Sequence, residues 1–532
     1  SVWITVALFF QIALLAGYAY AHALSVALSR RRQVIVHAAV CVAAALMLPV
    51  SIPADWAPSR ANLPQVDLIL LMVRSIGLPF FVVSATAPLL QRWYSLTSAQ
   101  DAGDPYHLYA ASNLGSLAAL FAYPTVIEPA LGLAAQSLAW SGGFGALLAA
   151  LAACAGAARQ AAQAARPVAT TNLPSSPITW RRRLYWIALA AAPSSLFLGL
   201  TTQISTDIAA VPLLWILPLA IYLLTFVIAF ARRPVLGRDA VARTIPYVAT
   251  IAVLVQGFET GIGPPQIAIG AVILFLLALM CHSDLAALRP APARLTEYYL
   301  LMSLGGALGG AFNAILAPLL FSGVYEYPIA LALAFLLWAA PRAETWTRRS
   351  ALPQIVGLAG AFLGLRAGLH AAAALGALHW MLGLKVLAAV LCFAARRRPL
   401  AMAMLAAVIL AAGSNVTLRP ELARYRSFFG VHRIERDDGD TLHFLVHGNT
   451  DHGAQFTDPA RRREPLIYYS VSGPAGQALA ALRPSGPLTP VGVIGLGAGA
   501  MACLAAPGES WTFFEIDPAI AATARDPRYF SY

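Results

Sequence analysis

The sequence predicts an α-helical membrane bundle followed by a small β-element and a short α/β domain. Hydrophobic residues make up 59% of the 532 residues and charged residues only 11%, and the mean hydropathy is +0.69. Such a composition is typical of a chain that lies mostly in lipid. Near Thr417 the pattern changes, because long apolar runs give way to alternating residues and a glycine-rich motif. The part before this point is therefore predicted to be membrane, and the part after it a soluble unit.

A helix needs about 20 apolar residues to cross the hydrocarbon, and the sequence offers about fourteen runs of this kind. They lie near 2–24, 33–50, 66–90, 108–126, 130–156, 184–203, 210–231, 243–258, 265–281, 297–320, 327–340, 351–365, 371–395 and 399–415. A basic linker rich in Ala, Pro and Ser at 157–183 separates a first group at 1–156 from a second group at 184–415. The first run lacks a basic leader, so we expect a span and not a signal peptide.

The distribution of basic residues tests these spans, because loops on the cytoplasmic side retain Lys and Arg. Alternate loops hold 21 arginines, whereas the intervening loops hold only Arg60 and Arg366. The net charge of +12 thus reflects membrane topology, and no nucleic acid is expected as a partner. The same rule places 416–532 on the outer face if 399–415 crosses once. Arg419, Arg424 and Arg426 favour the opposite side weakly, so the sequence leaves the side of the soluble unit open.

The soluble unit opens with two alternating segments. Residues 427–435 and 441–448 surround Asp437-Asp438-Gly439-Asp440, which predicts a β-hairpin within a β-element at 416–472. In 473–532 we expect a helix at 474–483, a strand at 490–495, a helix start at 499–505, a strand at 511–516 and a helix at 518–525. Ser1 lies inside an apolar span and Tyr532 follows only two strands of this sheet, so the chain is expected to be a fragment.

The main functional signal is Val-Ile-Gly-Leu-Gly-Ala-Gly at 493–499, followed by Phe-Phe-Glu-Ile-Asp-Pro at 513–518. Gly495, Gly497 and Gly499 remove side chains where the backbone must turn sharply, and a helix after them would offer unpaired N–H groups to a ligand. Glu515, about 20 residues later, is suited to accept hydrogen bonds from two ribose hydroxyls. This order of strand, glycines, helix, strand and acid favours a Rossmann-like cofactor site over a simple packing turn.

Residues 416–532 resemble the spermidine synthase (polyamine aminopropyltransferase) superfamily, in which a small β-element precedes a methyltransferase-type sheet. The membrane part is similar to bacterial fused membrane-transporter-like/spermidine synthase-like proteins. Three segments carry that similarity: Tyr109-Ala-Ala-Ser-Asn-Leu-Gly-Ser, Asp207-Ile-Ala-Ala-Val-Pro-Leu-Leu-Trp-Ile-Leu-Pro-Leu and Leu295-Thr-Glu-Tyr-Tyr-Leu-Leu-Met-Ser-Leu-Gly-Gly-Ala-Leu-Gly-Gly. The resemblance implies a multi-pass protein of the bacterial inner membrane that ends in a truncated Rossmann-like domain of the methyltransferase type.

The resemblance also implies a ligand and its contacts. The glycine loop and Glu515 would bind decarboxylated S-adenosylmethionine or a related adenosyl compound, with Gln455 as a further cofactor residue. Tyr468 and Tyr469 would line the pocket for a polyamine or related amine. In the parent reaction the amine attacks the methylene beside the sulfonium, which gives a longer polyamine and methylthioadenosine. A base must free the lone pair of that amine.

Departures from the family pattern bear on activity. Ala498 and Ser470 stand where true synthases usually carry acids, and the catalytic aspartate of the family is expected beyond Tyr532. We therefore expect no aminopropyl transfer by these 532 residues alone. Two alternatives stay open: a membrane transporter whose soluble domain senses a nucleoside-type ligand, and a methyltransferase-like enzyme.

Polar residues inside apolar runs are costly in lipid, so they mark candidate pathways or helix contacts. Arg74, Asn113 and Asp207 are the best pathway candidates, although a helix-pairing role is as probable for each. Asp207 is expected to face the interior of the bundle.

Other motifs favour structural roles. His447 and His452 flank the segment of Gln455, and we expect them to shape that loop by hydrogen bonds. Gly305-Gly306 and Gly309-Gly310 place small residues at a spacing that favours close helix packing over ligand binding. The five cysteines lack metal spacing, so neither a metal site nor a disulfide framework is predicted.

Overall fold

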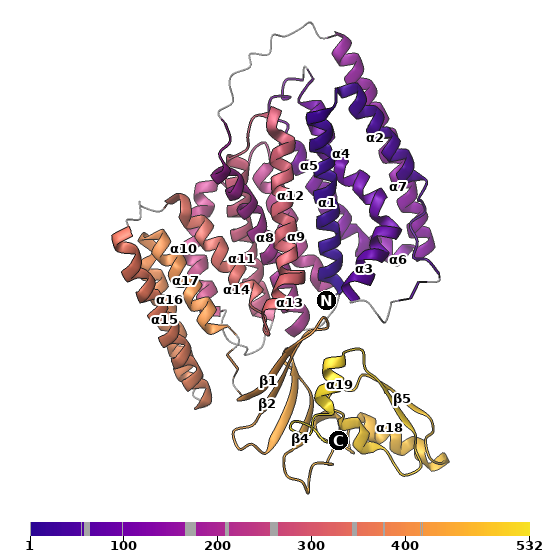
Figure 1. The fold of residues 1–532 in the computed structure, drawn as a ribbon, viewed down its shortest axis with the longest axis vertical. Coiled ribbons are helices and arrows are strands. Elements are labelled where there is room, and N and C mark those ends of the chain that lie inside the picture. The colour runs from indigo at the N-terminus through magenta and orange to yellow at the C-terminus, as the bar shows by residue number, and fades with distance from the viewer. Residues whose placement is uncertain are drawn as a thin grey trace.

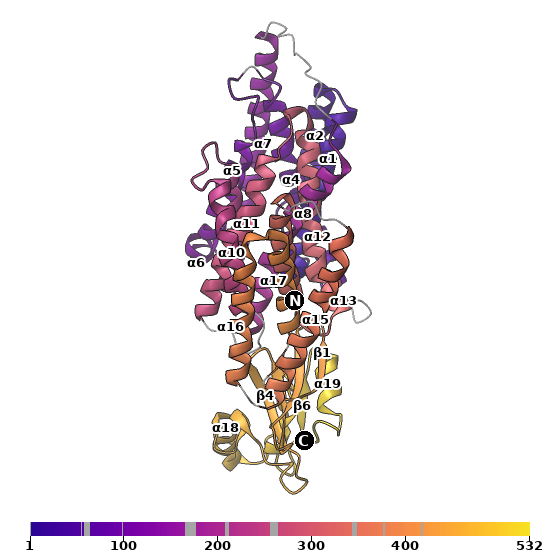
Figure 2. The same cartoon turned by 90° about the vertical axis from the view of Figure 1, so that its left-hand side faces the viewer.

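The computed structural model describes residues 2–54, 56–57, 64–97, 99–164, 177–207, 212–255, 264–342, 348–375, 378–414, 416–417 and 419–532. Within this part of the chain, the long helices precede Ser414 and all strands follow it. In Figure 1 and Figure 2 the strands lie beyond one end of the helical bundle, the end at which α1 begins. The described residues contain eight helices that are long and apolar enough to cross a membrane.

The helices of the bundle fall into two groups along the chain. The first group comprises α1 (Val2–Ala27), α2 (Arg30–Ala45), α3 (Pro64–Met72), α4 (Leu78–Tyr94), α5 (His107–Ala122), α6 (Glu128–Ala130) and α7 (Leu133–Ala164). The second comprises α8 (Trp180–Asp207), α9 (Pro212–Phe230), α10 (Arg238–Val255), α11 (Pro264–Ala287), α12 (Leu295–Ala311), α13 (Ala317–Leu320), α14 (Glu326–Ala339), α15 (Arg348–Ala374), α16 (Leu378–Ala394) and α17 (Pro399–Gly413). Short 3₁₀ helices cover Pro292–Arg294, Ala340–Arg342 and Ala395–Arg397.

One predicted span is wrong. The apolar run at 371–395 is not a single helix, because α15 ends at Ala374 and α16 begins at Leu378. Hydropathy did not reveal the boundary, because the residues on both sides of it are small or apolar.

Three of the long helices contain a π-helical segment. These segments are η1 (Val73–Gly77), η2 (Tyr123–Ile127) and η4 (Phe312–Leu316), and each ends two residues before a proline: Pro79, Pro129 and Pro318. A proline has no N–H to donate, and its ring clashes with the carbonyl four residues earlier. A wider turn relieves that clash without breaking the helix. The prolines therefore account for the position of each segment.

The helices α8 and α12 pack closely along glycines. A Cβ placed at Gly305 would lie 2.3 Å from the carbonyl oxygen of Ile187, and one at Gly309 would lie 2.5 Å from that of Ala191. Only glycine permits this approach of two backbones. The predicted packing role of these two glycines is confirmed.

The ends of the bundle differ in charge. At the end away from the strands, the connection between α4 and α5 forms two ion pairs, Asp101 with Arg232 and Asp104 with Arg289. At the same end, Arg183 in the first turn of α8 pairs with Glu297 in the first turn of α12. At the strand end, the described connecting residues 46–54, 56–57, 131–132 and 321–325 include no Lys or Arg. The arginine-rich connections therefore lie at the opposite end from the soluble unit.

The soluble unit contains a four-stranded antiparallel sheet in the order β1-β2-β3-β4. The strands are β1 (Glu421–Arg426), β2 (Val431–Arg436), β3 (Leu442–His447) and β4 (Thr450–Phe456). The β2–β3 hairpin is the predicted one, and the Asp437 carboxylate accepts the N–H groups of Thr441 and Leu442 at its turn. The outer strands β1 and β4 were not predicted, because their sequences do not alternate cleanly between apolar and polar residues.

A second sheet has two parallel strands, β5 (Val491–Ile494) and β6 (Trp511–Phe514). Near it lie α18 (Pro474–Leu482), α19 (Pro518–Ala524) and the 3₁₀ helices η7 (Ile467–Tyr469), η8 (Arg483–Ser485) and η9 (Ala500–Leu504). The predicted helix start at 499–505 is thus wrong in type, since η9 is a 3₁₀ turn. Pro507 and Gly508 follow it closely and prevent its extension as an α-helix.

The sheet is joined to the bundle by two direct contacts. Arg426 of β1 forms an ion pair of 2.8 Å with Glu326 of α14; the Glu326 side chain is 1% exposed and that of Arg426 is 9% exposed. A Cβ placed at Gly448, in the β3–β4 turn, would lie 2.2 Å from the carbonyl oxygen of Thr206 near the end of α8. The turn therefore rests on α8 without an intervening side chain.

The glycine contact between α8 and α12 predicts a sharp difference between neighbouring positions. Gly305→Ala should destabilise the protein by about 1–3 kcal/mol, because the added methyl overpacks the α8 backbone. Gly306→Ala is the matched control, since a Cβ there meets nothing within 4 Å. Thermal unfolding of the purified protein in detergent measures both, and equal losses would contradict this account of the packing.

Candidate functional site

The glycine loop and Glu515 lie at the same edge of the parallel sheet. Ile494 pairs with Phe514 as the last residues of β5 and β6, so the loop and the acid follow their strands side by side. Gly495, Gly497 and Gly499 have φ values of 89°, 57° and 89°. Such left-handed backbone is readily adopted by glycine alone. The three glycines therefore allow the loop to turn back sharply at this edge of the sheet.

The carboxylate of Glu515 bridges the two strand ends. One oxygen accepts the N–H of Leu496 in the glycine loop at 2.9 Å, and the other accepts the N–H of Asp517 at 2.9 Å. Glu515 is half-buried, and a Cβ placed at Gly495 would meet nothing within 4 Å. Each oxygen keeps a further lone pair. The structure therefore brings an open backbone position and an acceptor group together.

The antiparallel sheet covers the other side of the glycine loop. Ala498 is buried, and a Cβ placed at Gly453 of β4 would lie 2.5 Å from the Cβ of Ala498. A Cβ placed at Gly497 would lie 2.8 Å from the carbonyl oxygen of His452. The loop is thus closed towards β4, and only the side of Gly495 and Glu515 is left for a small molecule.

Gln455 lies on strand β4 and not in a loop, which corrects the sequence prediction of its setting. Its side chain is buried; the amide nitrogen Nε2 donates to the carbonyl of Arg462 at 3.0 Å, and Oε1 accepts the N–H of Ser531 at 2.9 Å. These bonds tie the end of the described chain to the sheet. Among the described contacts, none joins Gln455 to Glu515.

Tyr468 and Tyr469 form a pair at η7, with ring centroids 4.4 Å apart. Burial raises the pKa of the Tyr468 phenol, and the nearby Asp451 carboxylate raises it further. The described contacts place this pair near Asp451 and do not join it to the glycine loop. The two halves of the predicted site are therefore not brought into contact.

The membrane candidates have different surroundings. Arg74 is exposed on η1, at the outer surface of the bundle. The side-chain amide of Asn113 donates to the carbonyl of Tyr109 on its own helix at 2.8 Å, which is a local structural bond. Asp207 is the last residue of α8, but its side chain lies outside the described residues. The prediction that Asp207 faces the interior therefore stays a prediction.

A buried polar group that the sequence did not reveal lies behind the loop. Asp517 Oδ2 accepts the hydroxyl of Ser427 at 2.5 Å and lies 3.4 Å from Nε2 of His432. The ring of His432 lies 4.7 Å from that of His447, which in turn lies 5.9 Å from that of His452. His447 ends β3 and His452 lies within β4, so the segment that we expected these two histidines to shape is a strand and not a loop. The Asp-Pro pair was the available signal, because it is typical of a helix N-cap.

The other oxygen of Asp517, Oδ1, accepts the N–H of Ala519 and caps α19. No group of three or more His, Cys, Asp or Glu residues suited to a metal ion occurs among the described residues. Burial lowers the pKa of His432, His447 and His452, which we call the histidine row, so their rings are neutral at pH 7.

Comparison with known proteins gave no relative for this chain. No protein-family model matches it, no curated protein matches it, and no solved structure matches it.

The histidine row predicts a pH-dependent stability of the sheet. Burial lowers the pKa of His447 to about 4, and His432 and His452 act in the same direction. The unfolded chain therefore binds more protons than the folded one between about pH 6.5 and 4, and stability falls as the pH drops through this window. A pKa of about 4 in place of 6.5 corresponds to a loss of about 3 kcal/mol.

Hydrogen exchange of peptides from β3 and β4, corrected for the intrinsic effect of pH, measures this loss. His447→Gln should flatten the pH dependence, whereas His379→Gln in α16 should retain it. An unchanged pH dependence in His447→Gln would show that another group is responsible.

Proposed function

We propose that the C-terminal unit is a Rossmann-like domain of the methyltransferase type that binds an adenosyl compound, in a membrane-integrated spermidine synthase-like protein. One observation carries this proposal. Glu515, at the end of one parallel strand, accepts the N–H of Leu496 in the glycine loop at the end of the other. This geometry suits a ligand whose ribose meets the acid while its remainder passes over a glycine backbone.

The local structure supports a cationic ligand tail. The loop leads into the 3₁₀ turn η9, so it does not present the N-terminus of an α-helix, which would favour an anion. Decarboxylated S-adenosylmethionine has no carboxylate and bears a sulfonium and an amine. The residues present therefore fit this compound at its ribose and do not oppose its tail.

Aminopropyl transfer is the reaction that we propose for this domain. The nitrogen of a polyamine or related amine forms a bond to the methylene beside the sulfonium and the carbon–sulfur bond breaks. The proton of the amine passes to the catalytic aspartate that the family carries. Methylthioadenosine leaves with the electron pair of the broken bond. Glu515 would hold the ribose through both steps, because its position is fixed by two main-chain N–H groups.

We also propose that the bundle crosses a bacterial inner membrane about fourteen times. Six further helices, α2, α9, α10, α14, α15 and α17, lie in the bundle beside the eight apolar spans and would be the additional crossings. With that number of crossings, the arginine-rich connections share the cytoplasmic side. The soluble unit then lies on the outer side, since α17 leads from the arginine-rich end to β1.

This placement favours a second candidate function. A nucleoside-type ligand on the outer side would be sensed and not consumed, and the β3–β4 turn at Gly448 touches the end of α8 directly. The protein would then be a transporter whose soluble domain reports such a ligand to the bundle. In a protein that carries the family's catalytic aspartate, turnover of putrescine with decarboxylated S-adenosylmethionine supports the enzyme, whereas binding without turnover supports the sensor.

Loss of the Glu515 carboxylate should weaken ligand binding. In Glu515→Ala, the affinity for methylthioadenosine should fall about ten- to hundredfold, since two charge-assisted bonds of about 1.5–3 kcal/mol in total are lost. Calorimetry on the purified protein in detergent measures this change. Glu464→Ala is the control, because Glu464 is an exposed acid that pairs with Arg461 away from the loop. Equal affinities of wild type and Glu515→Ala would remove the basis of the proposal.

The proposed topology predicts which cysteines a membrane-impermeant maleimide reaches in spheroplasts. With the exposed Cys154 replaced by serine, Ser472→Cys should react in intact spheroplasts, because Ser472 is exposed on the soluble unit. Val235→Cys, in the exposed connection between α9 and α10, should react only after lysis. The reverse pattern would place the soluble unit in the cytoplasm.

A further inference from the structure

A cavity of about 410 Å³ opens at the junction of the bundle and the antiparallel sheet. Its wall comes from the connection between α13 and α14, from the last turns of α15, and from the segment that leads into β1. The volume lies within the range of about 300–1,000 Å³ that small-molecule sites occupy. The wall is rich in polar side chains, among them Tyr325, Arg366, His370, Arg419, Glu421 and Arg424.

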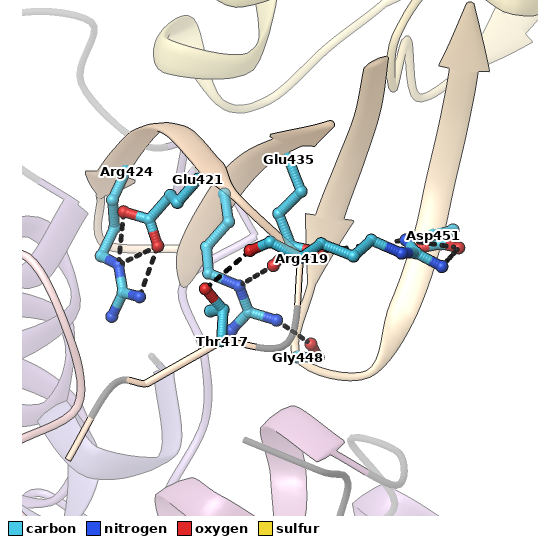
Figure 3. Close-up of polar contacts among 8 residues, drawn as sticks. Thr417, Arg419, Glu421, Arg424, Glu435, Gly448 and Asp451 are labelled. Carbon is cyan, nitrogen blue, oxygen red and sulfur yellow. Dashed lines mark hydrogen bonds and ion pairs between the residues drawn. The ribbon is translucent and has the colours of Figure 1, made fainter. Parts of the chain in front are cut away.

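Two of the three arginines are held by acids. Arg424 donates to both oxygens of Glu421, and Arg419 donates to both oxygens of Asp451, as Figure 3 shows. Such bidentate pairs fix the guanidinium planes. Asp451 does not line the cavity, so its charge lies behind Arg419. The acids therefore orient these two arginines and compensate their charge: Glu421 pairs with Arg424, and Asp451 pairs with Arg419, which also lies 3.9 Å from Glu435. The positive charge that remains on the wall is that of Arg366.

Arg366 differs from the other two arginines. Its described partners are the carbonyl oxygens of Ala412 and Ser414, each at 3.5 Å, and no carboxylate is among them. Carbonyl bonds at this distance are weak and leave the charge uncompensated. Arg366 also shares one face of α15 with His370 and Ala373, which lie four and seven residues further on. The small side chain of Ala373 lines the same cavity as Arg366 and His370.

The cavity lies close to the proposed membrane surface. Arg366 stands two turns before the end of α15, and α17 ends at Gly413 beside it. An arginine at this depth can bury its stem among the helices while its guanidinium reaches the headgroup layer. The hydroxyl groups of Ser322, Tyr325 and Thr417 also line the space and can donate to an anion.

We propose that this cavity binds a phosphate group, presented either by the headgroup of an anionic lipid or by a free phosphorylated small molecule. Guanidinium groups match the planar pairs of phosphate oxygens, and an arginine without an acid is the group that such an anion neutralises. A polyamine is excluded from this cavity by its like charge. This cavity is separate from the proposed adenosyl site at Gly495 and Glu515, and phosphate binding does not depend on that site.

Native mass spectrometry on the delipidated protein tests the proposal with two probes, phosphatidylglycerol and inorganic phosphate. We expect one tightly held anion in the wild type and about tenfold weaker binding or more in Arg366→Gln. Arg397→Gln is the matched control, because Arg397 is an exposed arginine at the opposite end of the bundle. Phosphatidylcholine, which is zwitterionic, should not replace phosphatidylglycerol.

A second pair of variants tests the proposal independently if Arg366→Gln does not fold. Ala373→Leu fills the cavity without changing its charge and should weaken binding as strongly, whereas Ala371→Leu, at an exposed position of α15, should not.

The two probes distinguish the sources of the phosphate group. Retention of phosphatidylglycerol that depends on Arg366, without binding of inorganic phosphate, identifies a lipid headgroup. Binding of inorganic phosphate that depends on Arg366 identifies a free phosphate compound. Unchanged binding of both probes in Arg366→Gln and Ala373→Leu, or equal losses in Arg397→Gln, would overturn the proposal.

Discussion

The buried ion pair between Arg426 and Glu326 is the contact on which the placement of the soluble unit depends. Glu326 opens α14 and is 1% exposed, so its charge needs a partner inside the protein. Arg426 ends β1 and also donates to the carbonyl of Gly323. Removing one member of a buried pair leaves the other uncompensated, which typically costs about 3–5 kcal/mol. The first strand is thereby fixed on the bundle.

The position of the candidate adenosyl site, which comprises the glycine loop and Glu515, depends on that strand. Pairing of β1 through β4 carries Gly453 to the glycine loop, where it closes on Ala498. The core beneath this contact is small and includes Ile434, Leu445 and Phe530. The loop conformation is therefore a result of both sheets, and the parallel strands alone would not hold it.

The parts that the sequence predicted are those set by local chemistry. The Asp-Gly turn, the strand before Gly495 and the helix after Asp517 each follow from nearby residues, and the structure has all three. Contacts between segments distant in the sequence could not be predicted from it. The bond between Gln455 and Ser531, and the cavity beside Arg366, depend on packing that leaves no local pattern. The strands β1 and β4 were not predicted for a related reason. Their residues do not alternate between apolar and polar, and they form strands because they pair with β2 and β3.

The contact of Gly448 with Thr206 has a thermodynamic consequence for the whole chain. It joins the hairpin of β3 and β4 to α8, and α8 is locked to α12 through Gly305 and Gly309. None of these joints contains a flexible side chain to absorb a displacement, so a shift of the hairpin is transmitted to the centre of the bundle. Linkage is reciprocal. Any molecule in the soluble unit that favours one position of α8 must be bound more tightly, by the same factor, when a solute in the bundle favours that position.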